Sequence, residues 1–119
     1  MGAHNDFGKE GEELAAAYLV KKGYLIICRN YRYMKAEIDI IAQKGSIIAI
    51  IEVKSRSSVY FEQIAETVSK KKIMLLVSAA DYYINTNKLD KEVRFDIITI
   101  LKENNKFLIE HFEDAFYHF

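Results

Sequence analysis

The stretch EIDIIAQKGSIIAIIEVKSR, residues 37–56, constrains the fold most, because two apolar and β-branched runs flank a short turn signal. Runs of this kind on either side of two residues that include glycine predict an antiparallel β-hairpin. With Lys44 and Gly45 as the turn residues, we expect Glu52 to lie opposite Glu37. The hairpin would then carry several ionisable side chains at its open end, although the rest of each strand is apolar.

Helical and alternating patterns on both sides of the hairpin predict the remaining elements. Two helices are expected, one that begins after Asn5 or Asp6 and ends before Gly23, and one that begins either near Glu62 or at Ser69. The strand YLIICRNYRY precedes the hairpin, and a second strand pair follows the second helix, with VRFDIITIL and KFLIEHF separated by KENN. The order α-β-β-β-α-β-β predicts an α/β fold, in which helices pack against a mixed central sheet.

Length and composition narrow the class of protein. At 119 residues the chain has the usual size of one domain, so we expect a single domain over residues 1–119. Seventeen basic residues balance seventeen acidic ones, so any nucleic-acid binding would depend on a local patch. The single Cys28 cannot form an internal disulfide, and no apolar run approaches the roughly 18 residues of a membrane span. We therefore expect a cytoplasmic protein with no membrane partner.

Ionisable residues alternate by two near the open end of the hairpin. Glu37 and Asp39 on one strand, and Glu52 and Lys54 on the other, are therefore expected to project from one face. Crowded carboxylates repel each other and are costly to remove from water unless a cation lies among them. Oxygen ligands of this kind suit Mg²⁺ or Mn²⁺. The spacing alone leaves a second interpretation open, in which Lys54 forms an ordinary structural salt bridge.

The spacing of Asp39 and of Glu52-Val53-Lys54 resembles the Asp…Glu-x-Lys signature of the PD-(D/E)xK nuclease superfamily. Six blocks together resemble the YraN-type family of bacterial endonuclease-like proteins, which is related to archaeal Holliday junction resolvases: GKEGEELAAAYLVKKGYLIICRNYR, EIDIIA, IIEVKSR, AETVSKKK, VRFDIITI and IEHFEDAF. The resemblance implies a restriction-endonuclease-like α-β-β-β-α-β core, extended here by one strand. It also implies metal-assisted hydrolysis of phosphodiester bonds.

The resemblance assigns roles to particular residues of the hairpin. It implies that Asp39, Glu52 and the Val53 backbone carbonyl bind the metal. Lys54 would orient the attacking water or stabilise the charge that develops on the phosphate. Three residues are expected to support the site: Glu37, Arg56 and Glu66. For Glu37, an ion pair with Lys35 or Arg56 is the alternative.

Glu12 corresponds to a glutamate on the first helix of the family, and the resemblance implies that it reaches the metal. It lies beside an inner face of small residues, Gly8, Gly11 and Ala15, which would let the helix pack closely on the sheet. The alternative is an exposed helix glutamate without a role in the site.

Two lysines of the second helix are candidates for DNA contact. If Ser69 is the N-cap, Lys70 and Lys72 lie in the first turn, where the helix dipole disfavours cations and a bound phosphate would compensate. A helix that begins near Glu62 would instead leave these lysines solvated in its middle.

A second basic segment covers residues 21–35, which hold five basic and no acidic residues. Arg29 and Arg32 are its candidates for DNA contact, and the interleaved tyrosines could stack on bases. The alternative is that these tyrosines pack within the sheet.

The three histidines lack the spacing of metal ligands, so we expect His4, His111 and His118 to be incidental. Asp96 is expected to pair with Arg94 or to cap the sheet near the site rather than to bind metal.

The sequence therefore predicts a metal-dependent endonuclease that hydrolyses DNA, with branched and single-stranded DNA among the substrates to test. Mg²⁺ or Mn²⁺ is the expected cofactor, DNA the expected partner, and a homodimer an assembly to test. The alternative is a non-catalytic module that binds nucleic acid or protein and retains the nuclease fold, which the net charge of zero and the aromatic C-terminal FEDAFYHF favour.

Overall fold

The computed structural model describes residues 3–56 and 69–116 of the chain. Within these residues two helices and five strands follow the predicted order: α1 (Ala3–Lys21), β1 (Leu25–Tyr33), β2 (Ala36–Lys44), β3 (Ile47–Arg56), α3 (Lys70–Thr86), β4 (Glu92–Glu103) and β5 (Lys106–Phe112). The strands form one sheet in the order β1-β2-β3-β4-β5, in which β3 and β4 run parallel and the other neighbours antiparallel. Neither of these helices is long and apolar enough to cross a membrane. The predicted α/β class with a mixed sheet is confirmed.

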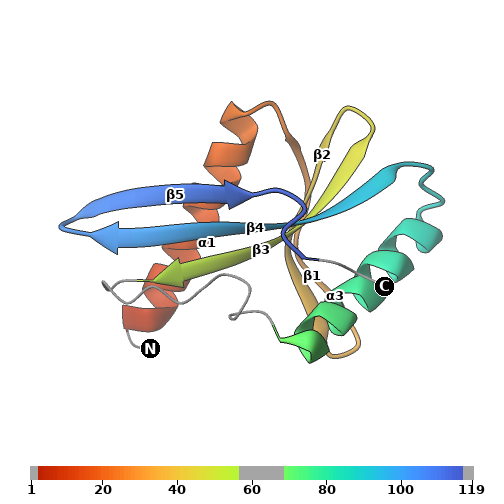
Figure 1. Cartoon of the computed structure of the whole chain (residues 1–119), viewed down its shortest axis with the longest axis horizontal. Coiled ribbons are helices and arrows are strands. Elements are labelled where there is room, and N and C mark those ends of the chain that lie inside the picture. Colours follow the sequence, from red (N-terminus) through yellow and green to blue (C-terminus); the bar gives the residue numbers. More distant parts are fainter. Residues whose placement is uncertain (1–2, 57–68, 117–119) are drawn as a thin grey trace.

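The helices pack against opposite faces of the sheet, as Figure 1 shows for α1 in red and orange and α3 in green. Successive side chains of a strand point to opposite faces. In β3, Ile48 and Ile50 therefore pack in the apolar cluster that contains α3, whereas Ala49 and Ile51 pack in the cluster that contains α1. Because residues 48–52 of β3 are buried on both faces of the sheet, a charged residue among them must find its partner inside the protein.

The β2–β3 hairpin turns one residue later than predicted. Its turn residues are Gly45 and Ser46, because Lys44 pairs with Ile47, and the φ angle of Gly45 is +60°. Glycine adopts such an angle without steric cost, and a type II′ hairpin turn places glycine at its first central position. The prediction that Glu52 lies opposite Glu37 is therefore wrong. The partner of each residue shifts by two positions, so the register shift by itself moves no side chain to the other face.

The β2 strand changes faces at Asp39. Ile38 packs in the cluster that contains α3, whereas Ile40, two residues later, packs in the cluster that contains α1. The residues of β2 that pair with β3 end at Ile40, opposite Ile51. Beyond this pair, the Asp39 carboxylate accepts a hydrogen bond from the backbone N–H of Val53 at 2.7 Å. Next to the last backbone pair of the two strands, this hydrogen bond from the Val53 N–H to the Asp39 side chain continues the link between β2 and β3.

The predicted N-cap is wrong for α1 and right for α3. The α1 helix begins at Ala3, so Asn5 and Asp6 lie within it and neither is its N-cap. For α3 the N-cap is Ser69, whose hydroxyl accepts a hydrogen bond from the Lys72 N–H at 3.1 Å. The first turn of α3 contains no acidic residue, so its lysines meet the positive end of the helix dipole, as predicted. The alternative start near Glu62 lies outside the described residues.

The turn between β4 and β5 and the packing of the C-terminal segment both depend on residue types that are visible in the sequence. Asn104 and Asn105, inside the KENN connection, have φ angles of +51° and +62°, which asparagine tolerates better than most residues. Phe116 packs in the cluster that contains α3, with its ring centroid 5.5 Å from that of Phe95. Part of the aromatic segment FEDAFYHF is therefore core, and residues 117–119 lie outside the described residues.

Candidate active site

The two acidic residues of the motif lie where the pairing of β2 with β3 ends. Glu52 is on β3 and only 4% exposed, and Asp39 is half-buried on β2. A hollow of about 250 Å³ opens between the start of β2 and the first turns of α3, and Asp39 and Lys72 both line it. Asp39 therefore lies at the hollow itself, and the buried Glu52 is connected to it through its ion pair with Lys72.

Two ammonium groups share one oxygen of Glu52. The Nζ atom of Lys54 lies 3.2 Å from Glu52 Oε2, and that of Lys72 lies 2.9 Å from the same atom. Burial alone would lower the pKa of Lys72, but the hydrogen bond and the negative charge of Glu52 outweigh it and raise this pKa. Lys72 is thus held as a cation at the acidic pair. Its side chain is 45% exposed against 16% for Lys54, so it is the more accessible of the two to an approaching anion.

Asp39 titrates near neutral pH. Burial raises its pKa most, the negative charge of Glu52 raises it further, and the hydrogen bond from Val53 opposes both, with a result of about 7. Lys54 and Lys72 both form their ion pairs with Glu52 rather than with Asp39, so Asp39 carries the less compensated charge. A cation that arrived beside Asp39 would therefore displace a proton from it at neutral pH.

Glu12 approaches the site from α1. Its side chain is half-buried, and burial raises its pKa, against the opposing effect of the Arg29 guanidinium. The helix can come this close because residue 11 is glycine: a Cβ there would lie 2.0 Å from Ser55 Oγ and 3.2 Å from Ser55 Cβ on β3. Gly8 has no atom within 4 Å of such a Cβ, so the close approach predicted for both glycines holds only for Gly11.

The close contact of α1 with β3 can be tested by adding a methyl group at Gly11. Gly11→Ala is expected to lower the free energy of unfolding by about 1–3 kcal/mol, because the added methyl group overlaps the Ser55 side chain, so that the Ser55 hydroxyl has to rotate or the helix has to shift. Gly8→Ala is the matched control, and it is expected to raise stability by up to about 1 kcal/mol through helix propensity alone. Urea unfolding of both variants measures the difference, and equal effects of the two substitutions would contradict this packing.

The two arginines that were candidates for DNA contact are both paired with acids. Arg29 Nη1 lies 2.9 Å from Glu13 Oε2, and Nη2 lies 4.0 Å from Glu12 Oε1. Arg32 Nε lies 3.3 Å from Glu37 Oε2, on residues that face each other across β1 and β2. Glu37 is exposed and pairs with neither of the two bases expected for it. These contacts leave less uncompensated positive charge on β1 than the sequence indicates.

The tyrosines of residues 21–35 divide into two groups. Tyr24, just before β1, is buried, and Tyr31 packs edge-on against Tyr83, with ring centroids 5.3 Å apart, so the packing interpretation is right for these residues. Tyr33 differs, because its ring stacks on that of the exposed Tyr82 on α3.

The remaining predicted site residues lie around this centre. Val53 is half-buried and bonds Asp39 through its N–H, and Lys70 is exposed in the first turn of α3. Arg56 is exposed at the end of β3 and donates to the Ser55 carbonyl oxygen at 2.9 Å. Glu66 lies outside the described residues.

A second polar cluster lies at β4 and β5, and its histidine was not predicted. Asp96 is fully buried, and its carboxylate accepts hydrogen bonds from Arg94 at 2.8 and 2.9 Å and from the Asp114 N–H at 3.1 Å. His111 Nε2 lies 2.7 Å from the same carboxylate, and its Nδ1 lies 3.2 Å from the Tyr18 hydroxyl. Burial would raise the pKa of Asp96, but these bonds outweigh it and lower the pKa. The predicted pair of Asp96 with Arg94 is confirmed, whereas the view of His111 as incidental is wrong.

No clear signal in the sequence pointed to His111, because its partners Asp96 and Tyr18 are 15 and 93 positions away. Alternation along β5 indicated only which face its side chain takes.

The donors available to a metal are few. Over residues 3–56 and 69–116, no group of three or more His, Cys, Asp or Glu side chains is arranged to hold a metal ion. The acidic pair therefore offers two carboxylates and neighbouring backbone oxygen, all of them hard donors.

Comparisons with known proteins agree with the motif. The sequence model of the uncharacterised protein family UPF0102 matches residues 11–100. A UPF0102 protein of Flavobacterium psychrophilum is 56% identical over 119 residues, which is the full length of both chains, and one of Flavobacterium johnsoniae is 50% identical over 123 residues, again with full coverage of both.

A solved structure is similar in fold. Hjc of Archaeoglobus fulgidus, a Holliday junction resolvase from an archaeal hyperthermophile, matches with a TM-score of 0.52 and 18% identity, over 89% of this chain and 76% of that one. The fold is thus restriction-endonuclease-like, as the resemblance implied. By the family match and by its relatives, the chain belongs to the uncharacterised protein family UPF0102, the YraN family that its sequence blocks resemble.

Proposed function

We propose that the protein is a metal-dependent endonuclease that hydrolyses phosphodiester bonds of DNA. The observation that carries the proposal is the surroundings of Glu52, a buried carboxylate that receives two ammonium groups next to a second carboxylate. A structural ion pair has no need of Asp39, because a second negative charge in a half-buried site costs free energy. Residues with strongly shifted pKa values and specific charged partners are typical of active sites.

Asp39, Glu52 and the Val53 carbonyl are the groups that would hold Mg²⁺ or Mn²⁺. All three offer oxygen, and Mg²⁺ commonly takes one or two carboxylates and completes its coordination with water. The pKa of about 7 for Asp39 supports this assignment, because it reports negative charge for which the protein supplies too little compensation. When bound, the metal would activate water and offset charge on the phosphate.

The two lysines are proposed to have separate tasks. Lys54 is largely buried beside Glu52, where its ammonium group would stabilise negative charge that develops on the phosphate oxygens as water attacks the phosphorus. Lys72 is more exposed and stands at the N-terminal turn of α3, where phosphate binding is favoured by the helix dipole. Glu12, on α1, would contribute a third carboxylate near the metal.

The test is cleavage of a panel of DNA by the purified chain during titration with Mg²⁺ or Mn²⁺. Linear duplex, single-stranded and four-way DNA belong in the panel, the last because the Archaeoglobus protein of the same fold is a Holliday junction resolvase. Cleavage is expected to depend on the divalent cation and to be lost in Glu52→Gln. Glu103→Gln, at an exposed acid at the end of β4, is the matched control and should cut normally. Absence of cleavage on all substrates, or cleavage that persists in chelator, would overturn the proposal.

A further inference from the structure

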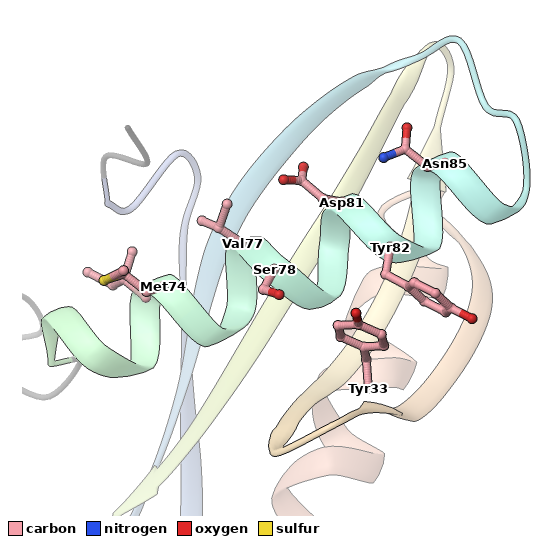
Figure 2. Close-up of a pocket in the computed structure, with 8 residues that line it drawn as sticks. Tyr33, Met74, Val77, Ser78, Asp81, Tyr82 and Asn85 are labelled. Atoms are coloured by element: carbon pink, nitrogen blue, oxygen red, sulfur yellow. The ribbon is translucent and has the colours of Figure 1, made fainter.

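A groove of about 480 Å³ runs along α3 on the side of the β1–β2 turn. Figure 2 shows that its walls come from α3 and from Tyr33, the last residue of β1. The rings of Tyr33 and Tyr82 lie nearly parallel, with an angle of 18° and centroids 4.2 Å apart. Tyr82 is 46% exposed and Met74, farther along the groove, is 68% exposed. The groove therefore presents a flat aromatic surface to solvent.

We propose that this groove holds an unpaired nucleobase of the DNA substrate, stacked on the Tyr33–Tyr82 pair. The inference rests on the proposed nuclease function and adds a substrate class to it, namely DNA with an unpaired base beside the cleaved bond. Aromatic side chains bind bases of any sequence by stacking, because every base has a π-face. A planar base would extend the existing stack as a third ring.

The polar side chains of the groove fit a base edge better than a phosphate. Ser78, Asp81 and Asn85 follow the same wall and are exposed. The Asp81 carboxylate repels phosphate, but it accepts a hydrogen bond from an exocyclic amino group, and the Asn85 amide can both donate and accept. The groove thus offers stacking on one side and hydrogen-bonding groups of both kinds on the other.

The position of the groove connects it to the candidate active site. Lys72 lines the hollow beside Asp39, while the next two residues, Ile73 and Met74, line the groove. On the other wall, Tyr33 lines the groove and Lys35, two residues later, lines the hollow. The lysines at the hollow suit backbone phosphates, and the aromatic rings at the groove suit bases of the same strand.

A second copy of the chain is the competing occupant of the groove. Exposed Met74 and Tyr82 are residue types that protein interfaces favour. Against this occupant, the core of such an interface is depleted of charge, whereas Asp81 lies in the wall of the groove. The lysines at the adjoining hollow also complement a nucleic acid.

The test uses DNA that carries the fluorescent base 2-aminopurine at an unpaired position, in the absence of divalent cations so that no bond is cut. Wild type and Tyr82→Phe are expected to quench the fluorescence, because both retain the ring. Tyr82→Leu and Tyr33→Leu should each weaken binding of this DNA by about tenfold, the scale of one lost aromatic stack. Binding of a fully paired duplex of equal length should change by less than about twofold, since phosphate contacts remain. Leu108→Ala, which removes an exposed apolar side chain on β5, should change neither.

The outcomes separate this inference from the proposed nuclease function. Equal losses for both DNAs, or no loss in either leucine variant, would overturn base stacking even if the protein cuts DNA. If quenching depends on Tyr82 but the protein cuts no DNA, base stacking in the groove is supported and the proposed nuclease function is overturned. Light scattering supplies the third arm: a wild-type dimer that Met74→Ser converts to a monomer would identify the groove as an interface between copies and overturn the inference.

Discussion

Lys54→Ala is expected to lower single-turnover cleavage by about a hundredfold or more, the scale for the loss of one contact made in the transition state. DNA affinity should change much less, because the Lys54 side chain is only 16% exposed, against 45% for Lys72. Lys54→Arg keeps the positive charge but spreads it over a planar fork that cannot place it at the same point. This variant should therefore fold and bind DNA without recovering the rate.

Lys72→Ala is the matched comparison, because Lys72 contacts the same oxygen of Glu52 from another element. It should weaken binding across all sequences and reduce the salt dependence of log K by about one unit, as expected for one phosphate contact. A binding module without catalysis would give this second pattern for Lys54 as well. A Lys54→Ala protein that cuts at the wild-type rate would falsify the role assigned to Lys54.

The parts of the site that could be predicted are those set by local periodicity. Alternation along β3 placed Glu52 and Lys54 on one face, and this placement survives the shift in hairpin register because the shift is an even number of residues. The N-cap Ser69 set the phase of α3 and turned Lys72 toward the sheet. The register itself was missed, because glycine at residue 45 fits either position of a two-residue turn.

The parts that could not be predicted depend on contacts between distant residues. Pairing of Arg29 with Glu13 requires that α1 lie over β1, and stacking of Tyr33 on Tyr82 requires that α3 approach the β1–β2 turn. No spacing rule links such residues, since their distance is set by how the helices dock on the sheet. Interpretation of residues 21–35 as a basic patch therefore overestimated its free charge.

The titration of Asp39 gives the second large effect. Its pKa of about 7 in the folded protein is above the ordinary value of an unfolded aspartate, so the folded state holds this proton more tightly. The contribution to stability is then fully present below about pH 4 and is lost as the pH rises through about 7. Asp39→Asn removes this loss, and its amide oxygen can still accept the Val53 N–H. At pH 8 and without metal, the variant should be more stable than wild type by on the order of 2–4 kcal/mol.

A divalent cation should offset most of this difference in stability between the two proteins. Binding displaces the proton from Asp39, so the affinity of wild type for Mg²⁺ should rise about tenfold per pH unit below pH 7. At a hundred times its dissociation constant, the cation should stabilise wild type by about 2.7 kcal/mol and leave Asp39→Asn unchanged. Asp90→Asn, at an exposed aspartate after α3, controls for the loss of one carboxylate. Urea unfolding of wild type and the variants at pH 5 and pH 8, with and without Mg²⁺, measures the stability under each of these four conditions. If Asp39→Asn is less stable than wild type without metal yet gains as much from Mg²⁺, Asp39 is a structural acceptor for Val53 and the metal lies elsewhere.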